Sequence, residues 1–307
     1  MSCKRFLWLG GLTALFTILS LMACGPKEQR AKGPKIVRPT PQAVDDFQEQ
    51  RNYAILVGVG RYADGAMTPL NYTVKDIKAL GEVLKDQGYT VYSLTDDRAT
   101  KGKILAKFRL LENSQANPGT LIFAFSGHGF GAADGGNYLA DYGTNASVIA
   151  ETGLKVARVA QAMRDSGAKR RLMLLDACRV QSGAMGGGRG FHDQDAEGLH
   201  ILQSTAPGQL RWEDPALEHS VITHFLIAGL RGESDERGHT AMRADGSITM
   251  ASLKDYLTER MRDYSAATDR EHLPYYSSRD TIGDPLIAQL ESPEELAAPP
   301  EPPPVVE

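Results

Sequence analysis

Apolar segments with the length of strands alternate with segments of helical periodicity, and this alternation limits the fold more than any other feature of the chain. Residues 53–59, Tyr-Ala-Ile-Leu-Val-Gly-Val, are apolar at nearly every position, which is typical of a strand covered on both faces. The other expected strands span 89–94, 120–125, 171–175 and 199–203. Helices are expected at 74–87, 101–113, 154–166, 220–231 and 250–264. Strands that alternate with helices predict an α/β fold, with a mostly parallel sheet and helices on both faces.

The first residues have the features of a bacterial export signal. Lys4 and Arg5 precede an apolar stretch at 6–21, which is shorter than the roughly 20 residues of a membrane-spanning helix. The Leu-Met-Ala-Cys that follows resembles the lipobox of bacterial lipoproteins, which implies a signal peptide at 1–23 and lipidation of Cys24. Two or three acyl chains anchor a protein stably. We therefore expect a lipid-anchored membrane protein of the bacterial cell envelope, on the periplasmic or extracellular side; an uncleaved amino-terminal anchor is the alternative.

The two ends of the remaining chain have compositions that do not form a hydrophobic core. Residues 24–50 are rich in Pro, Lys, Gln and Arg and are interpreted as a flexible linker, and residues 291–307 as a disordered Pro/Glu-rich tail. The chemistry is therefore expected in one domain at 51–290. The chain has a net charge of −4 and a pI near 6.0, without a long basic run, so we expect no nucleic-acid partner.

Two of the expected strands end in residue types that carry out nucleophilic catalysis. Ser-Gly-His-Gly at 126–129 follows the third strand, and Asp-Ala-Cys-Arg at 176–179 follows the fourth. The carboxyl ends of parallel strands meet at one edge of a sheet, so His128 and Cys178 are expected side by side if these strands are neighbours. A histidine can take the proton of a thiol and later protonate the leaving amine. The backbone amides of Gly129 and Cys178 are candidates for an oxyanion hole.

Each of these residues has a structural alternative. A lone cysteine after a buried strand is more often a small core residue. A histidine in a Gly-rich turn more often forms hydrogen bonds within the turn than acts as a base. Their occurrence together at equivalent strand ends favours catalysis.

The same blocks resemble the caspase-like cysteine peptidases of peptidase family C14, on the side of the bacterial metacaspase-like members, or orthocaspases. The resemblance covers most of 52–290 and includes Ser-Thr-Ala-Pro-Gly-Gln at 204–209 and the first part, 220–226, of the helix expected at 220–231. It implies a three-layer α/β/α sandwich of the caspase-haemoglobinase type with roughly six mostly parallel strands. It also implies Cys178 as nucleophile and His128 as general base and acid. The Gln-Ala-Cys-Arg-Gly signature of animal caspases is absent, because an Asp and a Val replace its first and last residues.

In metacaspase-like enzymes, one Asp two residues before the nucleophile and another early in the first helix line the specificity pocket. Asp176 and Asp76 match these positions, which implies cleavage after Arg or Lys. The alternatives are a first-turn helix acid for Asp76 and a strand-end cap for Asp176. The family also implies a cleavable loop after the nucleophile, in which Arg189 is a candidate autocleavage residue.

Other motifs are weaker. Residues 58–63 match a dinucleotide fingerprint, but residues 64–69 intervene where its helix should begin. Residues 244–249 resemble a calcium loop without its other acidic ligands, and the remaining histidines lack zinc spacing. We therefore expect no cofactor and no metal site; some metacaspases need calcium, and this sequence does not decide that point.

The sequence thus predicts a membrane-anchored, caspase-like cysteine endopeptidase that acts on protein or peptide substrates. The alternative is a non-catalytic caspase-fold binding or scaffold module at the cell envelope. The presence of both members of the dyad favours the enzyme.

Overall fold

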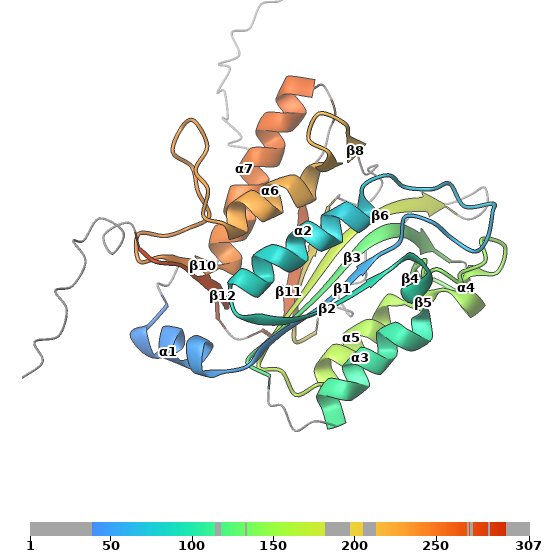
Figure 1. Cartoon of the computed structure of the whole chain (residues 1–307), viewed down its shortest axis with the longest axis horizontal. Helices are drawn as coiled ribbons and strands as arrows, with labels where there is room; N and C mark the ends of the chain where they lie inside the picture. Colours follow the sequence, from blue (N-terminus) through green and yellow to red (C-terminus); the bar gives the residue numbers. More distant parts are fainter. Residues whose placement is uncertain are drawn as a thin grey trace, which may run out of the picture. The chain divides into compact units, whose positions relative to one another are not determined.

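The apolar segments form one central sheet, whose strands run in the order β11–β7–β6–β3–β1–β2 (Figure 1). The computed structural model describes residues 39–113, 118–132, 134–181, 197–204, 213–268, 270, 273–281 and 283–292, with residues 178–181 described by their backbone. The strands of this path are β1 (Asn52–Gly58), β2 (Tyr89–Thr95), β3 (Thr120–Gly131), β6 (Arg170–Gln181), β7 (Leu199–Gln203) and β11 (Tyr275–Arg279). All neighbours are parallel except β11, which pairs with β7 in the antiparallel direction. The expectation of roughly six mostly parallel strands is confirmed.

Helices cover both faces of the sheet, because alternate residues of each strand are apolar on opposite sides. On one face, Ile122 and Ala124 pack in a cluster with residues of α2 (Thr73–Asp86), α6 (Val221–Leu230) and α7 (Met250–Thr268). On the other face, Phe123 and Phe125 pack with residues of α3 (Lys101–Asn113) and α5 (Val156–Asp165). Figure 1 shows the two helical layers on either side of the strands. The expected α/β/α sandwich is therefore confirmed.

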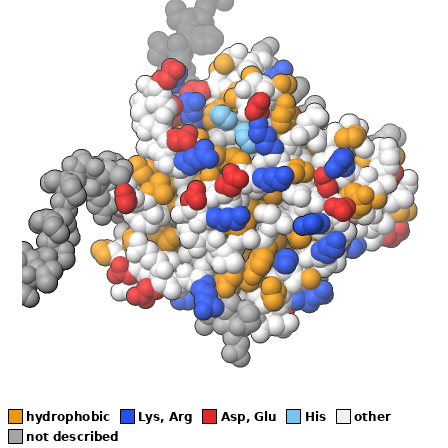
Figure 2. Space-filling model, in the orientation of Figure 1, with side chains coloured by type: hydrophobic (Ala, Val, Ile, Leu, Met, Phe, Trp, Pro, Cys, Tyr) orange, Lys and Arg blue, Asp and Glu red, His pale blue; other side chains and the backbone are white. Residues whose placement is uncertain are grey.

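Shorter elements complete the described structure. They are α4 (Ile149–Thr152), the 3₁₀ helix η1 (Asp96–Arg98), β4 (Asn137–Leu139), β5 (Leu154–Lys155), β8 (Glu213–Asp214), β9 (His219–Ser220), β10 (Ser247–Thr249) and β12 (Leu286–Gln289). On the face shown in Figure 2, basic and acidic side chains are interspersed. Within the described residues, the exposed large hydrophobic side chains are Leu110 and Val148.

Strands β3 and β6 are longer than the sequence predicts, and this difference affects the site. The sequence predicts strands that end at residues 125 and 175, whereas the ladder between β3 and β6 continues to the pair Gly131 and Gln181. The extension is stabilised on its other side by β4, which pairs with β3 from Gly129 to Gly131. His128 and Cys178 therefore lie within paired strands rather than in the turns after them.

The last part of the expected linker forms a helix, α1 (Pro41–Glu49). Thr40 caps its N-terminus by accepting a hydrogen bond from the amide of Ala43, and Pro41 occupies the first helical position. Phe47 is 4% exposed and packs edge-on against Tyr89. The helix was not expected because its single buried residue produces no apolar period in the sequence.

No helix in the described part of the chain is both long enough and apolar enough to cross a membrane. The apolar stretch at 6–21 and the candidate lipidation residue Cys24 lie outside the described residues, as does the tail from residue 293.

Replacement of Phe47 by Ala is expected to lower the free energy of unfolding by about 3 kcal/mol, because a buried aromatic ring is lost. Urea unfolding of the two chains measures the difference. Gln48→Ala, which alters an exposed residue of the same helix, is the matched control and should change the stability by less than about 0.5 kcal/mol. An equally small effect of Phe47→Ala would show that α1 does not pack on the domain.

Candidate active site

The parallel register of β3 and β6 places the two candidate catalytic residues opposite each other. The ladder begins at the pair Thr120 and Arg170, and its ninth pair is His128 and Cys178. Neighbouring strands are about 4.8 Å apart, so these two positions are adjacent in the sheet. The structure thus brings together the two positions that the sequence predicts as a dyad.

The ring of His128 is oriented by a backbone carbonyl. Its Nε2 lies 2.8 Å from the carbonyl oxygen of Thr68, in the loop between β1 and α2. A carbonyl only accepts hydrogen bonds, so Nε2 carries the proton in this contact. In the neutral ring the lone pair then resides on Nδ1, which is the nitrogen able to accept a proton. A general base needs this tautomer, because the nitrogen that accepts the proton must be the one that is not bonded to Thr68.

Tyr62 supports His128 from the same loop. Its ring stacks on the imidazole with a centroid distance of 5.2 Å. Its hydroxyl accepts a hydrogen bond of 2.9 Å from the backbone amide of His128 and donates one of 3.1 Å to the carbonyl of Val59. These contacts fix the backbone and the ring of His128, which is 7% exposed.

The glycines beside His128 allow close packing at the end of the sheet. A Cβ atom on Gly127 would lie 2.8 Å from Cζ of Phe125 and 3.2 Å from the hydroxyl oxygen of Tyr62. Gly129 is paired with Arg179 on β6 and with Leu139 on β4, so its backbone lies one position beyond the pair formed by His128 and Cys178. Its role in an oxyanion hole stays a prediction.

The two candidate specificity carboxylates both contact the start of α6. Asp76, on the first turn of α2, accepts a 2.7 Å hydrogen bond at Oδ1 from Nδ1 of His219 and longer ones from the amide of Ser220. Asp176, on β6, accepts a 3.4 Å hydrogen bond at Oδ2 from the hydroxyl of Thr223. The N-terminus of a helix carries partial positive charge and stabilises nearby carboxylates. The structure therefore places both acids beside the same helix turn, with Asp76 completely buried.

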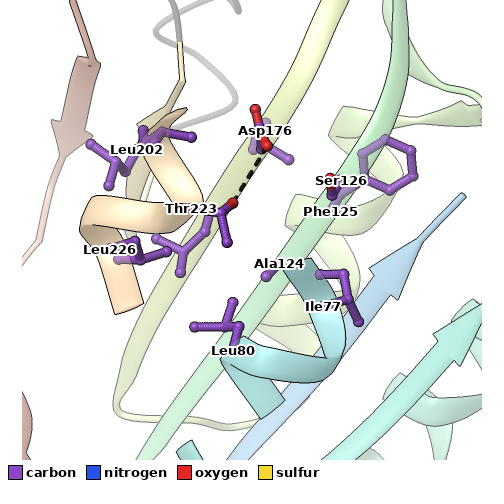
Figure 3. A pocket seen from close by; sticks show the side chains of 12 residues that line it. Ile77, Leu80, Ala124, Phe125, Ser126, Asp176, Leu202, Thr223 and Leu226 are labelled. Atoms are coloured by element: carbon purple, nitrogen blue, oxygen red, sulfur yellow. Dashed lines mark hydrogen bonds between the residues drawn. The ribbon is translucent and has the colours of Figure 1, made fainter. Parts of the chain in front are cut away.

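A small cavity of about 20 Å³, enough for about one water molecule, lies next to Asp176, between the sheet and helices α2 and α6. Figure 3 shows Asp176, Thr223 and Ser126 as its polar lining, with the Thr223–Asp176 hydrogen bond drawn. The rest of the lining is apolar, and it includes Leu80 and Leu226 from the two helices.

The loop after β1 does not have the structure of a dinucleotide site. A phosphate would bind to its backbone amides, but those of Gly60 and Arg61 donate to Oδ1 of Asp96 at 2.9 and 3.0 Å. The next helix begins only at Thr73. Within the described residues, no group of three or more His, Cys, Asp or Glu side chains is arranged to hold a metal ion.

Comparison with known proteins agrees with this architecture. Residues 51–282 match the Caspase domain family, and the chain belongs to that family. A crystal structure of caspase-1 from Spodoptera frugiperda is similar, with a TM-score of 0.57 and 16% sequence identity over 78% of this chain and 90% of that one. At this identity the similarity shows the fold alone. A search of curated proteins finds no match. Membership of the family implies cysteine peptidase activity.

Three contacts at the candidate site were not predicted from the sequence: those of the Thr68 carbonyl, the Tyr62 hydroxyl and the His219 imidazole. A backbone carbonyl has no sequence signal, and the fingerprint that residues 58–63 match assigns Tyr62 no role beside His128. The candidate autocleavage residue Arg189 lies outside the described residues.

Replacement of Tyr62 by Phe is expected to lower the free energy of unfolding by about 1–3 kcal/mol, because the buried amide of His128 loses its acceptor. Urea unfolding measures this loss. Tyr92→Phe is the matched control, since Tyr92 is a half-buried tyrosine whose ring stacks on Tyr53 and whose hydroxyl has no hydrogen-bond partner among the described residues. Equal stability of the Tyr62→Phe chain and the wild type would contradict the proposed support of His128.

Proposed function

We propose that the chain is a cysteine endopeptidase that uses Cys178 and His128 as a catalytic dyad. The observation that carries the proposal is the ladder between β3 and β6, which pairs the two residues. The contact between Nε2 of His128 and Thr68 supports it, because it leaves Nδ1 as the proton acceptor of the neutral ring.

The reaction follows from these roles. His128 takes the thiol proton, and the sulfur of Cys178 forms a bond to the carbonyl carbon of the scissile peptide. The amides of Gly129 and Cys178 stabilise the negative charge that develops on the carbonyl oxygen. The C–N bond then breaks, and His128 gives its proton to the leaving amine. Water hydrolyses the thioester with His128 again acting as base, which frees the carboxyl product and restores the thiol.

We further propose that the enzyme cleaves after Arg or Lys. Asp176 is two residues before Cys178 along β6, so the two positions are about 7 Å apart. A long basic side chain entering beside the nucleophile would meet Asp176 at its charged end. Asp76 adds negative charge from behind the first turn of α6.

The remaining parts of the proposal concern the ends and the processing of the chain. Lipidation at Cys24 would hold the peptidase at the membrane of a bacterial cell envelope, and residues 24–40 would connect the lipid to α1. Cleavage after Arg189 would be an autoprocessing event, consistent with a preference for basic residues. The substrates are proteins or peptides.

The test uses the full chain in detergent, under reducing conditions, with matched fluorogenic peptides that end in Arg, Lys or Asp. We expect cleavage of the Arg and Lys peptides with little cleavage of the Asp peptide, and a loss of at least about 10³-fold in the Cys178→Ala chain, because the nucleophile is missing. Assays with calcium and with a chelator determine whether the ion is needed.

Asp176→Asn is the specificity variant of the same experiment. We expect kcat/KM on the Arg peptide to fall by about 10- to 100-fold, because an uncharged amide replaces the carboxylate that binds the cation. Cleavage after Asp in the wild type would contradict the pocket assignment and retain the peptidase. No turnover of any peptide would instead favour a binding module on the caspase fold.

A further inference from the structure

Strand β2 forms an edge of the central sheet that is open to a further strand. In the described part of the chain it pairs with β1 alone, through seven residue pairs from Asn52–Tyr89 to Gly58–Thr95. Alternate residues of a strand turn their amide and carbonyl groups to opposite sides. One set of these groups in β2 therefore points toward β1, and the other set points away from the sheet.

The β2 edge lacks the features by which proteins commonly block an open edge. Its sequence, Tyr-Thr-Val-Tyr-Ser-Leu-Thr, contains no charged residue and no proline, and its ladder with β1 has no bulge. Charged residues, prolines and bulges discourage the addition of a strand. Strand β11, at the opposite edge, does contain a charged residue, Arg279. Of the two edges, β2 is therefore the one that is better suited to pair with another segment.

Basic side chains of α2 lie along one side of this edge. A Cβ atom on Gly81 would lie 3.4 Å from the hydroxyl oxygen of Ser93 and 3.5 Å from Val91, so this side of α2 faces β2. The exposed Lys78 and Lys85 are three residues before and four residues after Gly81, which places them on the same side of the helix.

Basic side chains also lie along the other side of the edge. Nζ of Lys107 on α3 lies 4.9 Å from the centre of the Tyr92 ring. Lys103 is one helix turn earlier on the same side of α3, and Arg98 is exposed in η1 immediately after β2. Among the described residues, neither these three side chains nor the two lysines of α2 form an ion pair with a carboxylate.

We refer to β2 with these five side chains as the basic edge. The whole chain carries a net charge of −4, whereas Lys and Arg side chains predominate on this part of the surface. Figure 2, which has the orientation of Figure 1, shows them on both sides of the region where β2 lies. The basic edge consists of β2, Lys78, Lys85, Arg98, Lys103 and Lys107, and the exposed acids on the same elements are Glu82, Asp86 and Asp97.

We propose that the basic edge binds an extended, acidic segment of a partner protein, which adds to the sheet as a further strand beside β2. The outward amides and carbonyls of β2 would pair with the backbone of the segment, and the basic side chains would bind its carboxylates. A second copy of this chain fits less well, because two basic edges repel each other. The inference goes beyond the proposed peptidase activity and does not depend on it, since β1 and β3 lie between β2 and the strand that carries Cys178.

The probe is the peptide Glu-Glu-Val-Thr-Val-Glu-Glu with blocked ends, and calorimetry measures its binding to the full chain in non-ionic detergent. At about 50 mM NaCl, where surface charges are weakly screened, we expect a dissociation constant below about 1 mM. The same peptide with Lys in place of Glu should bind at least about tenfold more weakly, because its charge is reversed. No binding of the acidic peptide, or equal binding of the two peptides, overturns the inference.

A proline peptide separates strand addition from attraction between charges. Glu-Glu-Pro-Pro-Val-Glu-Glu has the charge of the probe, but its two adjacent prolines remove one amide from each alternate set and so interrupt a continuous strand. It should bind at least about fivefold more weakly than the probe. Equal binding would show that charge alone attracts the peptide, and would overturn the proposed strand.

Charge reversal tests whether the peptide binds at the basic edge. Lys78→Glu and Lys107→Glu should each weaken binding by about three- to tenfold, because each replaces an attraction with a repulsion. Lys169→Glu is the matched control, since Lys169 is an exposed lysine immediately before β6. It should change the dissociation constant by less than about twofold. Equal effects of all three substitutions overturn the assignment to β2.

Hydrogen exchange followed by mass spectrometry locates the peptide and identifies other occupants. The probe should slow the exchange of Tyr89–Thr95 and leave that of β11 unchanged; no protection of β2 overturns the inference. Protection by the probe only after the four glutamates of residues 293–307 are replaced by Gln would assign the edge to the chain's own tail. Protection that increases with protein concentration, without the probe, would assign it to a second copy. Either result overturns the proposal of a separate partner.

Discussion

The register of the β3–β6 ladder is the constraint on which the rest of the site depends. Residues on one side of both strands, such as Ala124 and Leu174, pack in the cluster that includes α2 and α6, and their neighbours Phe123 and Met173 pack under α3 and α5. A shift by one residue would exchange these faces and expose or bury the wrong side chains. The core therefore fixes the register, and the register places position 128 beside position 178.

One loop connects the proposed dyad to the proposed specificity pocket. The segment between β1 and α2 supplies Tyr62 and the Thr68 carbonyl to His128, and it then leads into the helix that carries Asp76. Two carboxylates hold this segment. Asp96 accepts hydrogen bonds from the backbone amides at its start, and Glu213 accepts hydrogen bonds from the backbone amides of the two residues just before α2. Since the same backbone positions His128 and Asp76, changes at either end of this segment are expected to affect both the proposed cleavage and its proposed specificity.

Much of the fold could be predicted from the sequence, because its strands are short apolar runs and its main helices have a clear apolar period. The side-by-side placement of positions 128 and 178 could also be predicted, because each residue follows one of these apolar runs. The contact between His219 and Asp76 could not be predicted, because 143 residues separate them and the contact depends on how α6 packs on α2. The helix α1 was also not expected, since Phe47 is its single fully buried residue. Sequence patterns thus predict the helices and strands, whereas single contacts between distant segments can be found only in the structure.

The pairing of Cys178 with His128 as a reactive dyad is the central claim, and the rate of thiol alkylation tests it most directly. Iodoacetamide is applied at pH 6 to the wild type and to the His128→Ala chain, and the modification of Cys178 is followed by peptide mass spectrometry. A histidine beside the thiol favours the thiolate, so Cys178 of the wild type should react at least about tenfold faster than free glutathione. In the His128→Ala chain this advantage should disappear. Equal, slow alkylation of Cys178 in both chains would contradict the dyad.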